Sequence, residues 1–330
     1  MKHFCTIITA NYLPYAQQLY TCLSENFSGG VSLHTLISDV DSSSVEALSE
    51  NLKSNIICYS EKDLKGEMAD AFRQKYAEDN MDAYRWSMKT VFMKQLFGEP
   101  NIEKLIYLDC DIFFVGNGDF LFDMLSKHRF LITPHWRCAS DPAVDMENFQ
   151  LNFLDGVYNA GFIGARKDAI EILDFWGNCC LAVCEKNRPA GFYVDQKYLD
   201  ILPSRFPGIE VVRHKGCNLA GWNTLECPRS ENEKGGIKID GEFDPVFIHF
   251  TPETRRKIKS GDDPLFEPYF NEYNNLLKDY SNGLIDLSID QPENPQPEEP
   301  EPEPLLEAVR RTVRLRTRIK AFMDGKIVRK

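Results

Sequence analysis

The chain has 330 residues, 43% of them hydrophobic and 12% aromatic, so it can bury one large α/β core or two smaller ones. No apolar run approaches the roughly 20 residues that a transmembrane helix needs. The formal net charge of −12 does not favour a nucleic-acid-binding domain.

The charge is unevenly distributed along the chain. Residues 305–330 carry nine Lys and Arg residues against Glu307 and Asp324, a net charge of +7, which leaves −19 for residues 1–304. Residues 291–304 contain six prolines and five glutamates and nothing that can build a core, which indicates an extended linker of roughly 40 Å. We therefore expect a folded domain over residues 1–290, an acidic, proline-rich linker over 291–304 and a basic tail over 305–330.

The N-terminus and the cysteines indicate where the protein resides. The short apolar stretch in residues 1–10 leads into a helix pattern rather than a cleavage site, so we expect a first strand and not a signal peptide. The ten cysteines include no CxxC pair, and Cys110, Cys179 and Cys180 lie inside apolar runs where they act as small hydrophobes. These features predict a reduced, cytoplasmic setting.

The first half of the chain alternates strand and helix patterns. We expect strands at residues 4–10, 31–38 and 55–59, and helices at 14–27, 45–52 and 61–98. This βαβαβ order predicts right-handed crossovers and a parallel sheet that binds ligands beyond the carboxyl ends of its strands. Residues 9–11, Asp39 and the segment 109–111 then lie on one rim.

The apolar run of residues 104–116 is interrupted by Asp109 and Asp111. Such a run is typical of a strand buried on both faces of a parallel sheet, which would place both carboxylates in the core. Burying two like charges costs several kcal/mol unless a cation neutralises them, and Mg²⁺ or Mn²⁺ prefers such oxygen ligands. The alternative is a strand end at which both side chains reach solvent and cap a turn at residues 116–118.

The second half is less regular. Residues 157–165 read as a strand in which Asn159, Gly161 and Gly164 break the apolar pattern, which indicates either close approach by a ligand or a bulged edge strand. We expect further helices at 168–184, 194–202 and 265–280, strands at 210–213 and 246–250, and a loop at 216–223.

The order of the motifs resembles that of family 8 glycosyltransferases and related bacterial sugar transferases of the GT-A fold. The matching segments, spread over residues 1–280, are TANY at 9–12, YLDCDIFFV at 107–115, YNAGF at 158–162, the pair Asp195-Gln196, and IHF at 248–250. The resemblance implies a single Rossmann-like α/β domain with a mostly parallel mixed sheet flanked by helices. It also implies transfer of a sugar from a nucleotide diphosphate donor, a UDP-sugar, with retention of configuration.

The resemblance implies a metal site for Mn²⁺ or Mg²⁺ formed by Asp109, Asp111 and His249, which would offset charge on the departing nucleotide. Taken alone, the pattern around His249 favours a core histidine satisfied by hydrogen bonds, and only the context of Asp109 and Asp111 favours a metal ligand. Arg255 stands where the family has a lysine that contacts the diphosphate, although Pro252 replaces the family's glycine. Because Arg255, Arg256 and Lys257 form a cluster, the cation that binds phosphate stays open.

The resemblance also implies which residues bind the donor and the acceptor. Those implied for the donor nucleotide are Thr9, Ala10, Asn11, Tyr12 and Asp39. Lys89 either contacts a phosphate of the donor or is a solvated surface lysine. Those implied for the transferred sugar are Asn159, Ala160, Gly161, Asp195 and Gln196. Those implied for the acceptor are Asn218, Trp222 and Asn223, which match an NxAxWN segment, although a structural tryptophan is the alternative.

The implied catalytic pair is Asp195 and Gln196, with Gln196 near the anomeric carbon. Because an amide cannot form a stable glycosyl intermediate, we favour a front-face mechanism in which the departing phosphate oxygen takes the acceptor's proton. Three rivals are an inverting transferase with Asp195 as general base, a non-catalytic membrane-tethered sugar-nucleotide-binding protein, and a haloacid-dehalogenase-type phosphatase. The phosphatase motif has Thr or Val two residues after its second aspartate, where this chain has Phe113.

The basic tail has a helical pattern. At about 100° per residue, one sector contains Leu306, Val309, Val313, Ile319 and Met323, and the opposite sector contains Arg310, Arg311, Arg314 and Arg318. Arg316 and Lys320 fall on the apolar side, so the separation is incomplete. Such a helix lies in the membrane interface and is attracted to anionic lipid, which predicts peripheral attachment to the inner face of the membrane near a saccharide or lipid-linked acceptor. A solvated charged tail is the alternative, and we expect no nucleic-acid partner.

Overall fold

The computed structural model describes residues 1–50, 52–138, 140–233 and 235–288. The predicted linker (291–304), the predicted basic tail (305–330) and the end of the predicted domain at residue 290 lie outside the described residues. Among the helices of the described part, none is both long enough and apolar enough to cross a membrane. All ten cysteines are free.

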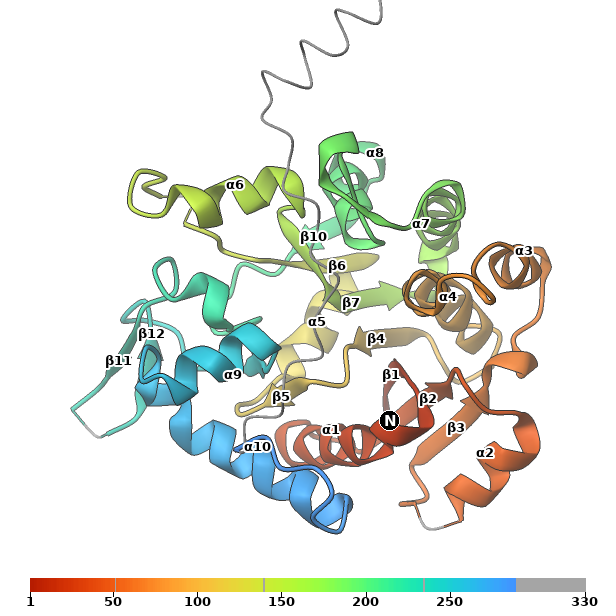
Figure 1. The fold of residues 1–330 in the computed structure, drawn as a ribbon, viewed down its shortest axis with the longest axis horizontal. Helices are drawn as coiled ribbons and strands as arrows, with labels where there is room; N and C mark the ends of the chain where they lie inside the picture. Colours follow the sequence, from red (N-terminus) through yellow and green to blue (C-terminus); the bar gives the residue numbers. More distant parts are fainter. Residues whose placement is uncertain (51, 139, 234, 289–330) are drawn as a thin grey trace, which may run out of the picture.

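The first half forms the parallel part of a mixed sheet (Figure 1). Strands β1 (Lys2–Ile8), β2 (Val31–Ile37), β3 (Ile56–Ser60) and β4 (Lys104–Leu108) run parallel in the order β4-β1-β2-β3. The helices between them are α1 (Leu13–Asn26), α2 (Ser42–Ser49), α3 (Glu67–Tyr76) and α4 (Met81–Leu96). The predicted parallel sheet is confirmed, and the carboxyl ends of β1, β2 and β4 lie on one rim as expected.

The second half extends the sheet from β4. Strands β6 (Phe130–Pro134), β7 (Tyr158–Arg166) and β10 (Ile209–Val211) complete the order β10-β6-β7-β4. Strand β7 is antiparallel to both β4 and β6, with a register shift opposite Ile132 and Thr133. It is therefore a central strand with a bulge, not the edge strand considered above, and its first residues lie at the same rim as the ends of β1 and β4.

Short strand pairs surround the rim. Strand β5 (Ile112–Phe114) pairs with β13 (Phe247–His249), β8 (Lys186–Asn187) with β9 (Phe192–Tyr193), and β11 (Arg229–Glu231) with β12 (Ile237–Ile239). The remaining helices are α5 (Asp119–Lys127), α6 (Met146–Leu154), α7 (Ile170–Ala182), α8 (Leu202–Arg205), α9 (Pro252–Lys259) and α10 (Glu267–Tyr280).

Two hydrophobic cores lie on opposite faces of the sheet. Alternate residues of β1 and β4 supply them: Phe4 and Ile106 pack with α1, α5 and α10, whereas Cys5 and Tyr107 pack with α3, α4 and α7. The alternation follows from the two-residue period of a strand covered on both faces. Figure 1 shows these two helical layers on either side of the sheet.

Three predicted elements differ from the structure. Residues 61–98 form two helices rather than one, because Gly66 has a φ of 109° before α3 and the Asn80 side chain caps α4. The predicted helix at 194–202 is the 3₁₀ helix η5 (Gln196–Ile201) followed by α8.

The predicted strand at 104–116 is interrupted at the aspartates. Asp109 N still donates across to Gly161 O of β7 (2.8 Å), but Ile112 N donates back to Asp109 O (3.1 Å), and this turn ends strand β4. The chain then leaves the sheet as β5 and pairs with β13. Asp109 and Asp111 are therefore half-buried at a strand end, with side chains 35% and 28% exposed, and not in the core.

Candidate functional site

Asp109, Asp111 and His249 meet at the rim although they come from distant parts of the chain. Pairing of β13 with β5 sets His249 opposite Ile112, the residue after Asp111. One potential ligand atom from each of the three residues lies within 4.8 Å of the others. His249 Nε2 is 2.9 Å from Asp111 Oδ1, and the Tyr107 hydroxyl donates to Asp109 Oδ1 at 2.8 Å.

The electrostatics of this cluster favour positive charge. Burial raises the pKa of Asp111, but His249 and Arg255 outweigh it, so the pKa lies below its ordinary value. Burial lowers the pKa of His249, but the Asp111 carboxylate outweighs it and the net pKa is raised. The Asp111 carboxylate thus stabilises the protonated imidazole of His249, which would release that proton on binding a metal.

The space beside the cluster fits a divalent cation. A Cβ added at Gly161 would lie 2.7 Å from His249 Cε1 and 2.9 Å from Asp109 Oδ2. The glycine therefore leaves open the space between these two side chains. Mg²⁺ prefers an all-oxygen set, whereas a set of two carboxylates and an imidazole is better suited to a softer ion such as Mn²⁺. The residues present thus fit a Mn²⁺ site.

A cavity of about 290 Å³ opens beside Asp109 and Asp111. Its other lining includes three cationic side chains and four aromatic ones: Arg85, Lys89, Arg255, Tyr12, Tyr15, Trp86 and Tyr107. Such a cavity offers positive charge for phosphates and flat apolar surface for a ring. Of the predicted donor residues, Tyr12, Lys89, Asp109, Asp111 and Arg255 share this cavity.

The structure distinguishes the three cations of α9. Arg255 lines the cavity, Arg256 is exposed to solvent, and Lys257 Nζ donates to Gly221 O at 2.7 Å. Pro252, the first residue of α9, also lines the cavity, so the positive end of the helix dipole faces the same space.

Lys89 is buried rather than a solvated surface lysine. It is 4% exposed, and its Nζ lies 3.0 Å from Asp195 Oδ2 and 3.5 Å from Asp109 Oδ1 and donates to Ala160 O at 3.1 Å. Burial lowers the pKa of Lys89, but Asp109 and Asp195 outweigh it and keep the ammonium charged. Lys89 thereby joins the aspartate cluster to the Asp195-Gln196 pair.

The turn after β1 docks on the turn after β2. Ala10 N donates to Asp39 Oδ1 at 2.8 Å, and the Thr9 hydroxyl donates to Asn11 Oδ1. Tyr12 is the member of this predicted set that lines the cavity. Asp39 therefore holds the turn through its backbone contact with Ala10.

The predicted sugar-binding residues form one network at the start of β7. Asn159 Oδ1 accepts from Gly161 N at 2.8 Å, and its Nδ2 donates to His135 Nε2 at 3.2 Å. Gln196 Oε1 accepts from Ala160 N at 3.3 Å, and its Nε2 donates to Asp155 O at 3.0 Å. Both ends of the Gln196 amide are thus engaged with the backbone.

Asn218 and Asn223, predicted to bind the acceptor, do not line the cavity. Both are fully buried; Asn218 Nδ2 donates to Pro134 O (2.9 Å), and Asn223 Nδ2 donates to Asn218 O (2.8 Å). Asn218 thereby attaches the loop to the end of β6, and Asn223 satisfies a carbonyl within the loop. Trp222 between them is 8% exposed and packs its ring edge against His249, 5.6 Å between centroids.

Some lining residues were not predicted from the sequence. Arg85 and Trp86 lie four and three residues before Lys89 on α4, a spacing that places them on the same helix face, so Lys89 was a signal for them. His135 does not line the cavity but contacts the predicted residues Asn159 and Trp222, and it had no comparable signal in the sequence.

Comparison with known sequences gives distant, partial matches. No protein-family model matches the chain. The uncharacterized proteins YfnF and YfnD of Bacillus subtilis (strain 168) are each 28% identical to it over 179 and 175 residues, 51% of this chain in both cases. The matches cover 56% and 53% of those proteins, so the chain spans about half the length of the curated relatives it matches.

Comparison with solved structures identifies the fold. The chain is similar to the galactosyltransferase LgtC, solved with donor and acceptor sugar analogs, with a TM-score of 0.55 and 12% identity over 84% of this chain and 95% of that one. Mouse xyloside xylosyltransferase 1 is similar at a TM-score of 0.49 and 15% identity, over 77% of this chain and 98% of that one. The predicted GT-A fold, a mostly parallel mixed sheet flanked by helices, is confirmed.

Proposed function

We propose that this chain is a metal-dependent glycosyltransferase of the family 8 type. It moves a sugar from a UDP-sugar to a saccharide or lipid-linked acceptor, with retention of configuration. The observation that carries the proposal is the cluster of Asp109, Asp111 and His249 beside a cavity that also presents Lys89 and Arg255. LgtC, which has the same fold, binds donor and acceptor sugar analogs.

Each part of the cavity has a role in donor binding. Asp109, Asp111 and His249 would hold a divalent cation, which would neutralise charge on the departing diphosphate as a Lewis acid. The planar fork of Arg255 and the amino end of α9 offer further donors for the same diphosphate. Tyr12 and Trp86 offer ring faces for the base.

The transfer step exchanges one bond for another at the anomeric carbon. The bond from that carbon to the phosphate oxygen breaks, and a bond to the acceptor oxygen forms on the same face. The acceptor's hydroxyl proton moves to the released phosphate oxygen. Gln196 and Asn159 position the sugar, so the chain contributes orientation and electrostatic stabilisation rather than a nucleophile.

The inverting alternative requires Asp195 as a general base. Burial raises the pKa of Asp195 although Lys89 Nζ lies 3.0 Å from its Oδ2, but the residue is only 1% exposed, so an acceptor does not reach the carboxylate directly. This favours retention. The anomeric configuration of the product, read by NMR before mutarotation, separates the two outcomes.

A screen of nucleotide sugars tests the proposal. We expect one donor class to raise the unfolding temperature in the presence of Mn²⁺, and the same donor to be hydrolysed slowly without acceptor. Asp111→Asn should abolish both effects, whereas Asp168→Asn at the far end of β7 should preserve both. No response to any nucleotide sugar with Mn²⁺ would refute the assignment.

A further inference from the structure

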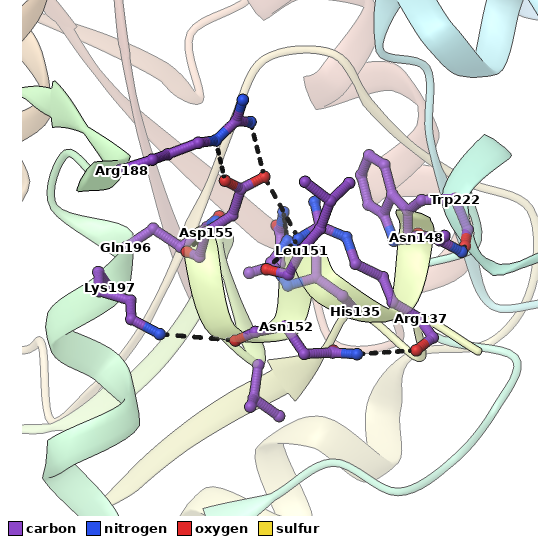
Figure 2. Close-up of polar contacts among 12 residues, drawn as sticks. His135, Arg137, Asn148, Leu151, Asn152, Asp155, Arg188, Gln196, Lys197 and Trp222 are labelled. Atoms are coloured by element: carbon purple, nitrogen blue, oxygen red, sulfur yellow. Dashed lines mark hydrogen bonds and ion pairs between the residues drawn. The ribbon is translucent and has the colours of Figure 1, made fainter. Parts of the chain in front are cut away.

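Helix α6 has an unusual attachment to the rest of the domain. None of its residues is buried, so the hydrophobic effect contributes little to holding it. Polar contacts hold it instead, and Figure 2 shows them between the helix and its neighbours. Arg137 Nη1 donates to Leu151 O (3.0 Å), and Asn152 Nδ2 donates back to Arg137 O (2.8 Å).

The two ends of α6 touch the two sides of the candidate site. Near its start, Asn148 Nδ2 donates to the carbonyl of Trp222 at 2.7 Å, and Trp222 packs against His249. At its end, Asp155 is the C-terminal cap, and its carbonyl accepts from Gln196 Nε2 at 3.0 Å. The position of α6 therefore sets the position of the Gln196 amide.

A buried ion pair fixes the Asp155 end. Asp155 is 2% exposed, and Arg188 contacts both of its carboxylate oxygens, Nε to Oδ1 at 2.7 Å and Nη2 to Oδ2 at 3.1 Å. Arg137 Nη1 lies 3.4 Å from Oδ2 on another side. A bidentate arginine fork restricts the carboxylate in direction as well as in distance.

Arg188 and Gln196 belong to one segment and hold Asp155 from two sides. Arg188 begins the 3₁₀ turn η4 (Arg188–Ala190) between β8 and β9, and the chain returns through β9 to Asp195 and Gln196. The segment 188–196 thus binds the Asp155 side chain with Arg188 and its carbonyl with Gln196. Gln196 Oε1 then accepts from Ala160 N, next to the Gly161 beside the metal cluster.

We propose that Asp155 and Arg188 are positioning residues for Gln196 in the transfer reaction; this inference rests on the function proposed above. Asp155, Arg188 and Gln196 do not line the cavity with Asp109, Asp111 and Arg255, so the pair acts through the hydrogen bond of Gln196 to Ala160 N and not by contact with the donor nucleotide. Loosening it releases α6 and lets the Gln196 amide leave its place at Ala160. A displaced group at the reacting carbon slows the chemical step more than it weakens donor binding.

The test compares matched aspartate variants of the full chain. Asp155→Asn and Arg188→Gln each remove the ion pair, whereas Arg188→Lys keeps the positive charge without the bidentate fork. The double variant Asp155→Asn/Arg188→Gln measures the coupling between the two side chains. Asp168→Asn is the control: Asp168 also has two arginine neighbours, with Arg166 Nε donating to its Oδ1 at 3.0 Å and Arg129 Nε at 3.7 Å from its Oδ2, at the opposite end of β7. Folding is checked by thermal unfolding.

The readouts are kcat and donor KM for nucleoside diphosphate release with Mn²⁺, together with hydrogen exchange of the peptide that contains Ala160. We expect Asp155→Asn to lower kcat roughly 10- to 100-fold with donor KM changed less than about threefold, and to raise exchange at Ala160. Arg188→Lys should recover part of kcat, and the double variant should be no slower than Asp155→Asn. If Asp155→Asn does not fold, the Arg188 variants provide the test, because Arg188 is partly exposed and its replacement is less disruptive.

A kcat for folded Asp155→Asn or Arg188→Gln equal to that of Asp168→Asn would overturn the positioning role and leave the transferase intact. A donor KM that rises while kcat is unchanged would overturn it in the same way. A wild-type chain that releases no nucleoside diphosphate from any donor would instead overturn the proposed function, and the positioning role with it.

Discussion

Lys89 Nζ lies 3.0 Å from Asp195 Oδ2, and the two side chains are only 5% and 2% exposed. The ion pair connects α4 to the Asp195-Gln196 segment through the interior of the domain. Since a buried charge without a partner is strongly unfavourable, the pair is a sensitive point for stability.

Lys89→Met should destabilise the fold by about 3–5 kcal/mol, because it leaves Asp195 buried without its cation. Asp195→Asn should lower the free energy of unfolding by less, because Lys89 Nζ still has two partners, Asp109 Oδ1 at 3.5 Å and the carbonyl of Ala160. Urea unfolding of both variants and of the double variant measures these costs and their coupling. Equal costs for the two single variants would contradict this asymmetry.

Gly161→Ala should remove metal binding without unfolding the chain. Its Cβ would come within 2.9 Å of Asp109 Oδ2 and 2.7 Å of His249 Cε1, which must move apart. Gly164→Ala on the same strand is the matched control, since its Cβ would meet only Leu131 and cost packing. We expect Mn²⁺ to raise the unfolding temperature of the wild type and of Gly164→Ala, but not of Gly161→Ala.

His34 should make the fold sensitive to mild acid. It is 3% exposed in β2, and burial and His3 lower its pKa to about 4. Between this value and about 6.5, the unfolded chain binds a proton that the folded chain does not, so stability falls as the pH falls through that window, by on the order of 3 kcal/mol. In His34→Gln this part of the pH dependence should be absent.

The half-buried His128, whose side chain is 34% exposed at the end of α5, provides the comparison. Urea unfolding at several values from pH 7 to pH 4 should give the same slope for His128→Gln as for the wild type. A His34→Gln slope that matches the wild type as well would show that another group controls acid unfolding.

The sequence predicted the rim of the site better than its surroundings. Residues 9–12, Asp109 and Asp111 follow strands whose patterns are strong, and the parallel sheet brings their ends together. His249 lies 138 residues from Asp111, and only the resemblance to known transferases connected them. Local periodicity cannot supply such a contact, because it depends on the pairing of β5 with β13.

The contacts of polar residues in loops are harder to predict, for a physical reason. Asn218 and Asn223 look like ligand-binding amides, yet Asn218 donates to the carbonyl of Pro134 at the end of β6, and Asn223 donates to the carbonyl of Asn218 within the loop. Asp155 and Arg188 carry no motif, and their pairing is visible only when α6 and the β8–β9 turn are in place. Whether a polar side chain binds a ligand or a buried carbonyl is decided by tertiary contacts that the local sequence does not encode.

The basic segment 305–330 lies outside the described residues, and we propose that it holds the chain at the inner face of an anionic membrane. The full chain should pellet with anionic but not neutral vesicles, and less at high salt. Replacing Arg310, Arg311, Arg314 and Arg318 with glutamine should weaken binding by about 1 kcal/mol per residue. Equal sedimentation of the wild-type chain and the glutamine variant with anionic vesicles would contradict the membrane assignment but would not affect the proposed transferase activity.

The most direct test of the central claim is metal-dependent release of nucleoside diphosphate from the donor identified by the nucleotide-sugar screen. With Mn²⁺ the wild-type chain should release it, and excess chelator should abolish release until Mn²⁺ is restored. Asp111→Asn should remain folded and lose activity by orders of magnitude, while Asp168→Asn stays near the wild-type rate. Full activity of the wild type in excess chelator, or of Asp111→Asn with Mn²⁺, would contradict the account.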